Sequence, residues 1–84
     1  MKILSWNIAF LPEIINSFKN SNLRLNAIKK LIKHVDPDII CLQEVFSSES
    51  RKVLSNFLKN KYYITLSPRT MFILNGGLLI ASKY

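Results

Sequence analysis

The stretch DIICLQEV, residues 38–45, decides how this 84-residue chain folds. Four consecutive apolar residues follow Asp38 and end abruptly in an amide and a carboxylate. A short continuous apolar run of this kind predicts a strand that is buried within a sheet. Because a buried strand has no use for a carboxylate unless something binds it, Glu44 is a candidate functional residue.

The sequence before this stretch predicts a strand and then a helix. Residues 2–8, KILSWNI, mix large apolar residues with little helical period, which is typical of a strand covered on both faces. Between Ser21 and Val35, apolar residues recur every three to four positions and lysines occupy the other side, so we expect an amphipathic helix. Ser21 is its expected N-cap, and Asp36-Pro37 its expected end, because the residue before proline avoids the α region.

Strand, helix and strand in this order form a βαβ unit, in which the two strands are parallel. Their carboxyl ends then lie at the same edge of the sheet, where Asn7 and Glu44 stand. Ligands of such sheets tend to bind at this edge. We therefore expect Asn7 and Glu44 to converge, with Glu44 facing a ligand.

The sequence after the stretch predicts a second helix and two more strands. The helix runs from Ser48 to about Asn60, with Ser47 or Ser48 as its N-cap. Strands are expected at 62–66 and 78–82, separated by a turn at 67–69 and a break at 75–77, and residues 71–74 are expected to pair with the last strand as a hairpin. The predicted order is thus β-α-β-α-β-β.

Composition limits the chain to one globular domain with a modest core, at 49% hydrophobic and 20% charged residues. The net charge of +7 favours polyanionic partners, although nine of the twelve basic residues are lysines spread over helix faces and loops, which indicates compositional bias at least as strongly. The single cysteine, Cys41, excludes an internal disulfide, so a reducing, cytoplasmic location is the expectation. The longest uncharged segment, 70–82, is shorter than the roughly 20 residues of a membrane span, so we expect no transmembrane segment.

One carboxylate and one amide oxygen suit a hard cation such as Mg²⁺, which is commonly held by one or two carboxylates together with phosphate oxygens. There are structural alternatives for both residues. Glu44 could cap a following turn or pair with a lysine, and Asn7 could end its strand through local turn hydrogen bonds. Spacing alone does not decide between these roles.

Three segments in order, SWNI at 5–8, PDIICLQEVF at 37–46 and NGGLLIASKY at 75–84, resemble the opening third of the endonuclease/exonuclease/phosphatase superfamily, the DNase I-like phosphodiesterases. The LQE after a buried strand is the most specific of them. The resemblance implies an α/β (α+β) fold in which residues 1–84 are the N-terminal third of a four-layer α/β sandwich. It also implies a Mg²⁺ cofactor, or Mn²⁺ in its place, with Glu44 as a metal ligand. By the same resemblance, Asn7 lies beside the metal and the phosphate, as a catalytic residue and a part of the metal site. Gln43 is then expected to support Glu44 from the second shell of the metal.

Residues that flank the motifs, such as Val45-Phe46, resemble the neutral sphingomyelinase branch more than the abasic-site endonucleases. The substrate implied is a phosphodiester, in a phospholipid headgroup or in nucleic acid. The catalytic histidines, the Asp-x-Asn element and the Ser-Asp-His motif of the family have no counterpart in the chain, and His34, Asp36 and Asp38 match no motif. We therefore expect the 84 residues to need a missing C-terminal portion for activity; the alternative is a catalytically dead remnant or a small binding module that keeps the βαβ core.

Overall fold

The computed structural model describes residues 1–10, 21–45, 47–67 and 77–84 of the chain. Its six elements follow the predicted order. They are β1 (Ile3–Phe10), α1 (Ser21–Val35), β2 (Ile39–Val45), α2 (Ser48–Leu58), β3 (Tyr63–Leu66) and β4 (Leu79–Ser82). The boundaries agree with the predicted ones to within two residues. The hairpin expected from 71–74 and the capping role expected of Ser21 lie outside what the structure describes.

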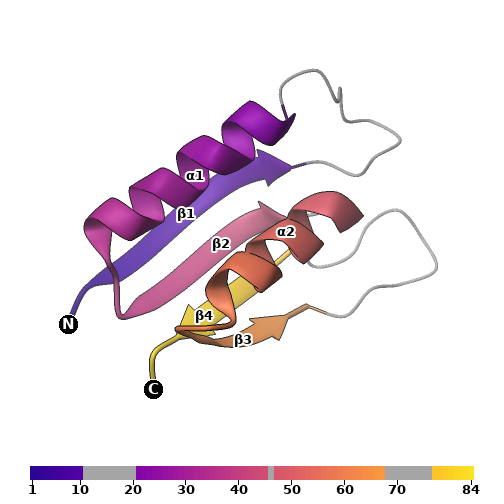
Figure 1. Cartoon of the computed structure of the whole chain (residues 1–84). Coiled ribbons are helices and arrows are strands. Elements are labelled where there is room, and N and C mark those ends of the chain that lie inside the picture. The colour runs from indigo at the N-terminus through magenta and orange to yellow at the C-terminus, as the bar shows by residue number, and fades with distance from the viewer. Residues whose placement is uncertain (11–20, 46, 68–76) are drawn as a thin grey trace.

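The four strands form one sheet in the order β1-β2-β4-β3. β1 and β2 are parallel, as the βαβ unit requires, and β4 is antiparallel to both β2 and β3. β3 therefore runs in the same direction as β1 and β2, so that all three end at one edge of the sheet. Figure 1 shows this edge, and shows α1 and α2 side by side on one face of the sheet.

The helix α1 packs on the sheet through Leu25, Ile28 and Ile32, which are all buried. Leu31 also belongs to the apolar period of this helix, but it is 39% exposed. The helix ends where predicted. Asp36 takes a left-handed backbone conformation with φ 49°, and its N–H donates to the Ile32 carbonyl at 2.8 Å. Aspartate tolerates this conformation better than most residues, so Asp36 ends the helix before Pro37.

The helix α2 begins at an N-cap formed by Ser47. The Ser47 hydroxyl accepts a hydrogen bond from the Ser50 N–H at 3.1 Å, which satisfies a donor that the first turn leaves without a helical partner. Leu54 and Leu58 of α2 are buried, and Val53 and Phe57 pack against the core from its border. The helix ends at Leu58, two residues earlier than the predicted Asn60.

Within the part of the chain that the structure describes, helices cover only one face of the sheet. This differs from the cover on both faces that the sequence predicts for residues 2–8. Ile40, Leu42, Leu79 and Ala81 are buried on the helix side. On the opposite face, Ile3 is 65% exposed and its row in the sheet continues through Ile39 and Ser82 to Tyr63, which is 73% exposed. We call this second surface the open face. Because side chains alternate along a strand, the apolar residues of β1 lie on both faces: Leu4 and Trp6 on the helix side, and Ile3 on the open face.

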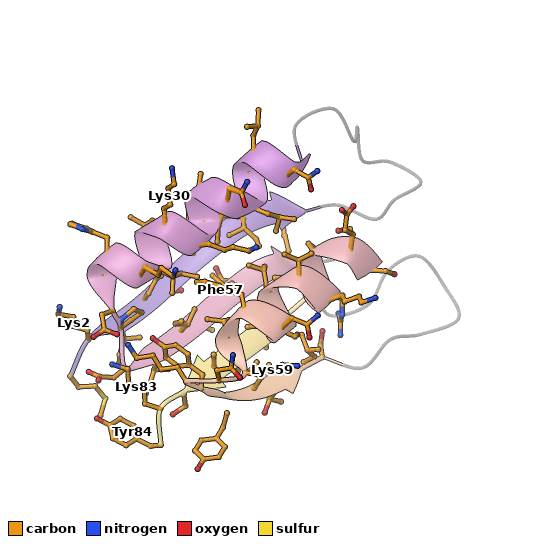
Figure 2. All side chains as sticks on the ribbon, in the orientation of Figure 1. Lys2, Lys30, Phe57, Lys59, Lys83 and Tyr84 are labelled. Carbon is orange, nitrogen blue, oxygen red and sulfur yellow. The ribbon has the colours of Figure 1, made fainter. Side chains whose placement is uncertain are left out.

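Charged side chains gather at the edge of the sheet where α1 ends and β2 begins. The Asp36 carboxylate accepts a hydrogen bond from the Lys61 ammonium at 2.5 Å. It also forms an ion pair with the Lys83 ammonium at 3.2 Å. The Asp38 carboxylate accepts from the Lys2 N–H at 2.7 Å. We call this cluster the amino-edge network. Other lysines, such as Lys30 and Lys59, extend from the helix layer (Figure 2), and no described helix is long and apolar enough to cross a membrane.

Candidate functional site

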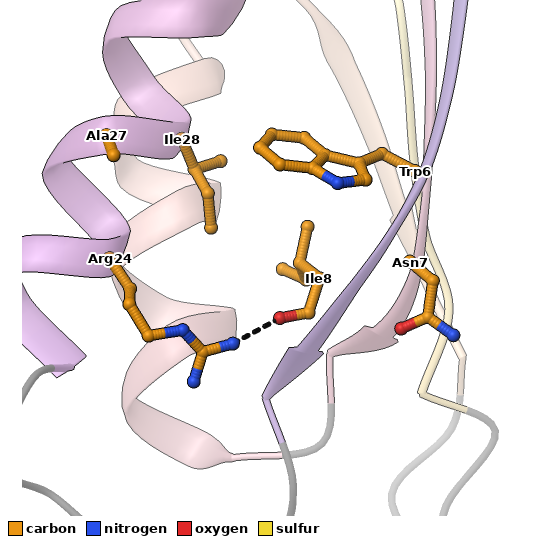
Figure 3. Close-up of a pocket in the computed structure, with 6 residues that line it drawn as sticks. All are labelled: Trp6, Asn7, Ile8, Arg24, Ala27 and Ile28. Carbon is orange, nitrogen blue, oxygen red and sulfur yellow. Dashed lines mark hydrogen bonds between the residues drawn. The ribbon is translucent and has the colours of Figure 1, made fainter.

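Asn7 lies near the carboxyl end of β1 on the open face. The neighbouring residues Trp6 and Ile8 pack on the helix side, and Figure 3 shows the Asn7 side chain on the other side of the strand. Asn7 is exposed, and in the sheet it is directly paired with Gln43 of β2. The prediction that Asn7 stands beside the end of β2 is therefore confirmed by the strand register.

Glu44 interrupts the regular alternation of β2. Leu42 and Val45 both belong to the buried core, although residues three apart on a regular strand point to opposite faces. The irregularity lies at Glu44, whose φ of 58° is left-handed, a conformation that is uncommon for a residue with a side chain. β2 thus changes faces at Glu44, a half-buried residue that directly follows Gln43, the partner of Asn7 in the sheet.

The residue after Glu44 is held by β4. The Val45 N–H donates to the Gly77 carbonyl at 2.7 Å, two residues before β4 begins. Gly77 is buried and has a φ of 60°, which glycine adopts without the steric cost of a Cβ. The unusual backbone at Glu44 is therefore fixed on one side by the pairing with β1 and on the other by the start of β4.

Gln43 joins the two parallel strands on the open face. Its Nε2 donates to the Ser5 hydroxyl of β1 at 3.1 Å and to the Cys41 carbonyl at 3.0 Å. The bond to Ser5 links β2 to β1 one residue before Glu44, whereas the bond to Cys41 stays within β2. Gln43 thus contacts the neighbouring strand through Ser5, and neither of these two bonds joins it to the Glu44 side chain.

The oxygen donors at this edge are of the kind that Mg²⁺ prefers. Glu44 and Asn7 supply one carboxylate and one amide from adjoining strands. Nowhere in the described part of the chain do three His, Cys, Asp or Glu side chains gather as metal ligands. This donor set does not fit a closed cage for a transition metal, but it fits a cation that keeps several waters and shares phosphate oxygens.

A hollow of about 340 Å³ opens between α1 and β1 and is lined in part by Trp6, Asn7 and Ile28, although the Asn7 side chain lies on the other side of the strand (Figure 3). Arg24 of α1 closes one side of it by donating from its guanidinium to the Ile8 carbonyl at 2.5 Å. The apolar period of 21–35 alone places Arg24 on the polar side of the helix, together with the lysines. Its position one helical turn before the buried Ile28 was the available signal that it faces β1.

Asp36, Asp38 and the single histidine, His34, lie elsewhere. Asp36 and Asp38 belong to the amino-edge network, at the opposite edge from Glu44. Hydrogen bonds from the Lys61 and Lys83 side chains lower the pKa of Asp36, and a hydrogen bond from the Lys2 backbone lowers the pKa of Asp38. His34 is exposed in the last turn of α1, at the same opposite edge. None of the three contributes to the edge that carries Asn7 and Glu44.

Comparison with known proteins gives a family and a fold. Residues 4–84 match the profile of the Endonuclease/Exonuclease/phosphatase family. A beta hairpin deletion mutant of beta toxin from Staphylococcus aureus is 21% identical with a TM-score of 0.79, and the match covers 99% of this chain and 35% of that chain. Sphingomyelinase C from Streptomyces griseocarneus is 18% identical with a TM-score of 0.83, covering 100% of this chain and 34% of that one. The chain thus spans about a third of the length of these two solved structures. The comparison with curated proteins found no match.

Proposed function

Because the chain belongs to the endonuclease/exonuclease/phosphatase family, we propose that it forms the metal-binding part of a Mg²⁺-dependent phosphodiesterase. Membership of this superfamily of phosphodiesterases and phosphohydrolases confirms the resemblance expected from the SWNI, LQEVF and GLLIAS segments. The likeness to solved structures confirms the predicted α/β fold of the DNase I-like type.

The observation that carries the proposal is the left-handed backbone of Glu44 at the carboxyl end of a central strand. A non-glycine residue in this conformation is strained, and such strain concentrates at functional sites, where the surrounding structure enforces it. A glutamate that only ended a strand would need no such conformation. This favours a ligand for Glu44 over the alternative roles as a turn cap or a lysine partner.

In the proposed site, the Glu44 carboxylate holds the divalent cation, with Mn²⁺ as a substitute for Mg²⁺. A bound Mg²⁺ would stabilise the negative charge that develops on the phosphoryl oxygens during hydrolysis. Asn7, which is neutral, orients a phosphate oxygen through its amide, and Gln43 keeps the two strands in register behind them. The general acid and base are assigned to the part of the fold that this third does not include.

The proposed substrate is a phosphodiester, with a phospholipid headgroup favoured over nucleic acid. One of the solved structures with this fold is a sphingomyelinase C, an enzyme named for its action on a phospholipid. Hydrolysis is proposed for the completed fold, in which the remaining two thirds are supplied in the same chain or by another. The 84 residues alone are expected to bind the cation without turning over substrate.

The test uses the single tryptophan, because Trp6 adjoins Asn7 in β1. Paramagnetic Mn²⁺ is titrated into the chain while the fluorescence of Trp6 is followed. We expect saturable quenching, and an increase of the Mn²⁺ midpoint on the order of tenfold or more in Glu44→Gln, which removes the charge but keeps the shape. Asn7→Ala should shift the midpoint less.

Glu49→Gln is the matched control, because it removes one exposed carboxylate from the nearby first turn of α2. Its midpoint should stay that of the parent. Equal midpoints for the parent and Glu44→Gln, in proteins whose circular dichroism is unchanged, would contradict the metal role. That result would favour the second candidate, a remnant or binding module that keeps the fold without the site.

A further inference from the structure

Arg51 is a buried cation close to the proposed site that sequence reasoning did not single out. It lies in the first turn of α2 and is only 5% exposed. Burial disfavours a charge, and the amino end of a helix carries a partial positive charge that repels a cation. An arginine at this position therefore has to be stabilised by specific contacts, and these contacts indicate what it does.

The guanidinium of Arg51 binds the end of β3. Its Nη2 donates to the Ser67 carbonyl. Ser67 is itself tied to the residue that precedes β4: its N–H donates to the Leu78 carbonyl at 2.9 Å, and its hydroxyl accepts from the Leu78 N–H at 3.0 Å. Arg51 thereby anchors the junction of β3 and β4 to the beginning of α2.

The same junction holds the backbone at Glu44. Gly77, the neighbour of Leu78, accepts the hydrogen bond from the Val45 N–H at 2.7 Å. On the other side, the Arg51 N–H donates to the Ser47 carbonyl at 3.1 Å, and Ser47 follows Val45 by two residues in the chain. The contacts therefore close a ring that runs from Val45 through Ser47, Arg51, Ser67 and Gly77 back to Val45.

We propose that Arg51 is a positioning residue that, through this ring, holds Glu44 in its left-handed conformation and so sets the affinity of the site for a divalent cation. The effect on the cation rests on the proposed function. The physical reason is that a left-handed glutamate relaxes to an extended or helical backbone when its neighbours allow it. Opening the ring at Arg51 would let the backbone of Glu44 leave this conformation and so displace its carboxylate.

Amide hydrogen exchange tests the ring without reference to function. Arg51→Met keeps much of the length of the side chain and removes its donors. We expect the amides of Val45 and Leu78 to exchange about tenfold faster in this variant, while the Lys83 amide, which donates to the Asp38 carbonyl at the opposite edge, stays within about twofold. Lys52→Met, which removes an exposed charge from the adjacent residue, should change none of the three.

Unchanged exchange at Val45, or the same acceleration at Val45 and Lys83, would overturn the proposed ring. Should Arg51→Met fail to fold, Ser67→Ala removes one of the two hydrogen bonds between Ser67 and Leu78 and leaves Arg51 in place. A smaller but still local acceleration at Val45 is expected for it. Exchange at Val45 equal to the parent in a folded Ser67→Ala would then count against the proposal.

The Mn²⁺ titration of Trp6 fluorescence tests the consequence for the site. Arg51→Lys keeps the charge but not the planar guanidinium, and we expect its Mn²⁺ midpoint to rise about threefold to tenfold. Ile32→Val is the control for a general loss of stability, because Ile32 is buried under α1 near the opposite edge. It should lower the melting temperature and leave the midpoint unchanged.

The two proposals fail in different ways. If Glu44→Gln does not change the titration, the metal role fails, and the exchange rates still decide whether Arg51 holds the ring. If Glu44→Gln abolishes the response but Arg51→Lys shifts the midpoint no more than Ile32→Val does, the metal role stands and the positioning role of Arg51 is wrong.

Discussion

The backbone of Glu44 is unfavourable for any residue that carries a Cβ, so function and stability should conflict at this position. A left-handed conformation costs roughly 1–2 kcal/mol for such a residue, and glycine avoids this cost but loses about 0.5–1 kcal/mol of conformational entropy on folding. We therefore expect Glu44→Gly to leave the free energy of unfolding unchanged or to raise it by up to about 1 kcal/mol, while the Mn²⁺ response is lost.

Urea unfolding followed by circular dichroism measures the stability part of this prediction. Gln43→Gly is the comparison, because Gln43 has no left-handed backbone and bonds to Ser5 across the sheet. It should destabilise the fold by at least about 0.5–1 kcal/mol. A loss of that size in Glu44→Gly as well would show that the strain at Glu44 is not real.

For α2 and its N-cap, we expect the replacement of serine by alanine to have opposite effects at two positions, Ser47 and Ser55. The Ser47 hydroxyl caps the helix and is buried, and it also donates to the Ser50 hydroxyl at 2.7 Å. Ser47→Ala should cost about 1 kcal/mol, in the range of about 0.5–2 kcal/mol for lost N-caps. The Ser55 hydroxyl, by contrast, is buried without a hydrogen-bond partner among the described residues.

Ser55→Ala should therefore be neutral or stabilising by a few tenths of a kcal/mol, because it removes a buried polar group and introduces a better helix former. Thermal unfolding of the two variants beside the parent checks both expectations. Destabilisation by Ser55→Ala as large as that by Ser47→Ala would mean that the Ser55 hydroxyl makes a contact that the structure does not contain.

At the scale of the whole molecule, the amino-edge network predicts how stability depends on pH. The lowered pKa values of Asp36 and Asp38 mean that the folded state binds their protons more weakly than the unfolded state, whose carboxyls titrate near 3.8. Their contribution is present above that pH and is lost as the pH falls through the lower folded values. For Lys83, the hydrogen bond to Asp36 raises the pKa above 10.5, so its contribution is present below that pH and is lost as the pH rises above it.

Melting temperatures between about pH 2 and pH 7 at low salt measure the acid side of this dependence. We expect the melting temperature to fall below about pH 4, and to fall less steeply in Asp36→Asn than in the parent. The effect should be small, because these groups are exposed and surface ion pairs contribute little. An unchanged slope in Asp36→Asn, with Glu49→Gln as the control, would exclude Asp36 as a source of the acid sensitivity.

The open face predicts how the 84-residue chain behaves in solution. Ile3 and Tyr63 are exposed at the two ends of one row across the sheet, and such apolar surface promotes association. We expect the chain to self-associate or to be marginally stable, and Ile3→Ser combined with Tyr63→Ser to shift it toward monomer. Sedimentation velocity measures the distribution. A monodisperse parent with a sharp cooperative melt would contradict this expectation.

The sequence by itself determined the order of the elements, the parallel pairing of β1 with β2 and the common edge at which Asn7 and Glu44 stand. These features depend on local signals, namely the apolar periods of 21–35 and 48–58, the apolar run at 39–42 and the Asp36-Pro37 helix stop. A right-handed crossover between parallel strands then leaves little freedom in where their ends lie.

Only the tertiary structure decided that β4 lies between β2 and β3, that β2 changes faces at Glu44, and that Arg24 and Arg51 turn inward. Each of these depends on a contact between residues far apart in the chain, such as Val45 with Gly77 or Arg51 with Ser67. An arginine has the same local pattern whether its long side chain meets water or a distant carbonyl. The backbone conformation of Glu44 is likewise set by the strands on either side of it, which is why no propensity along the sequence could reveal it.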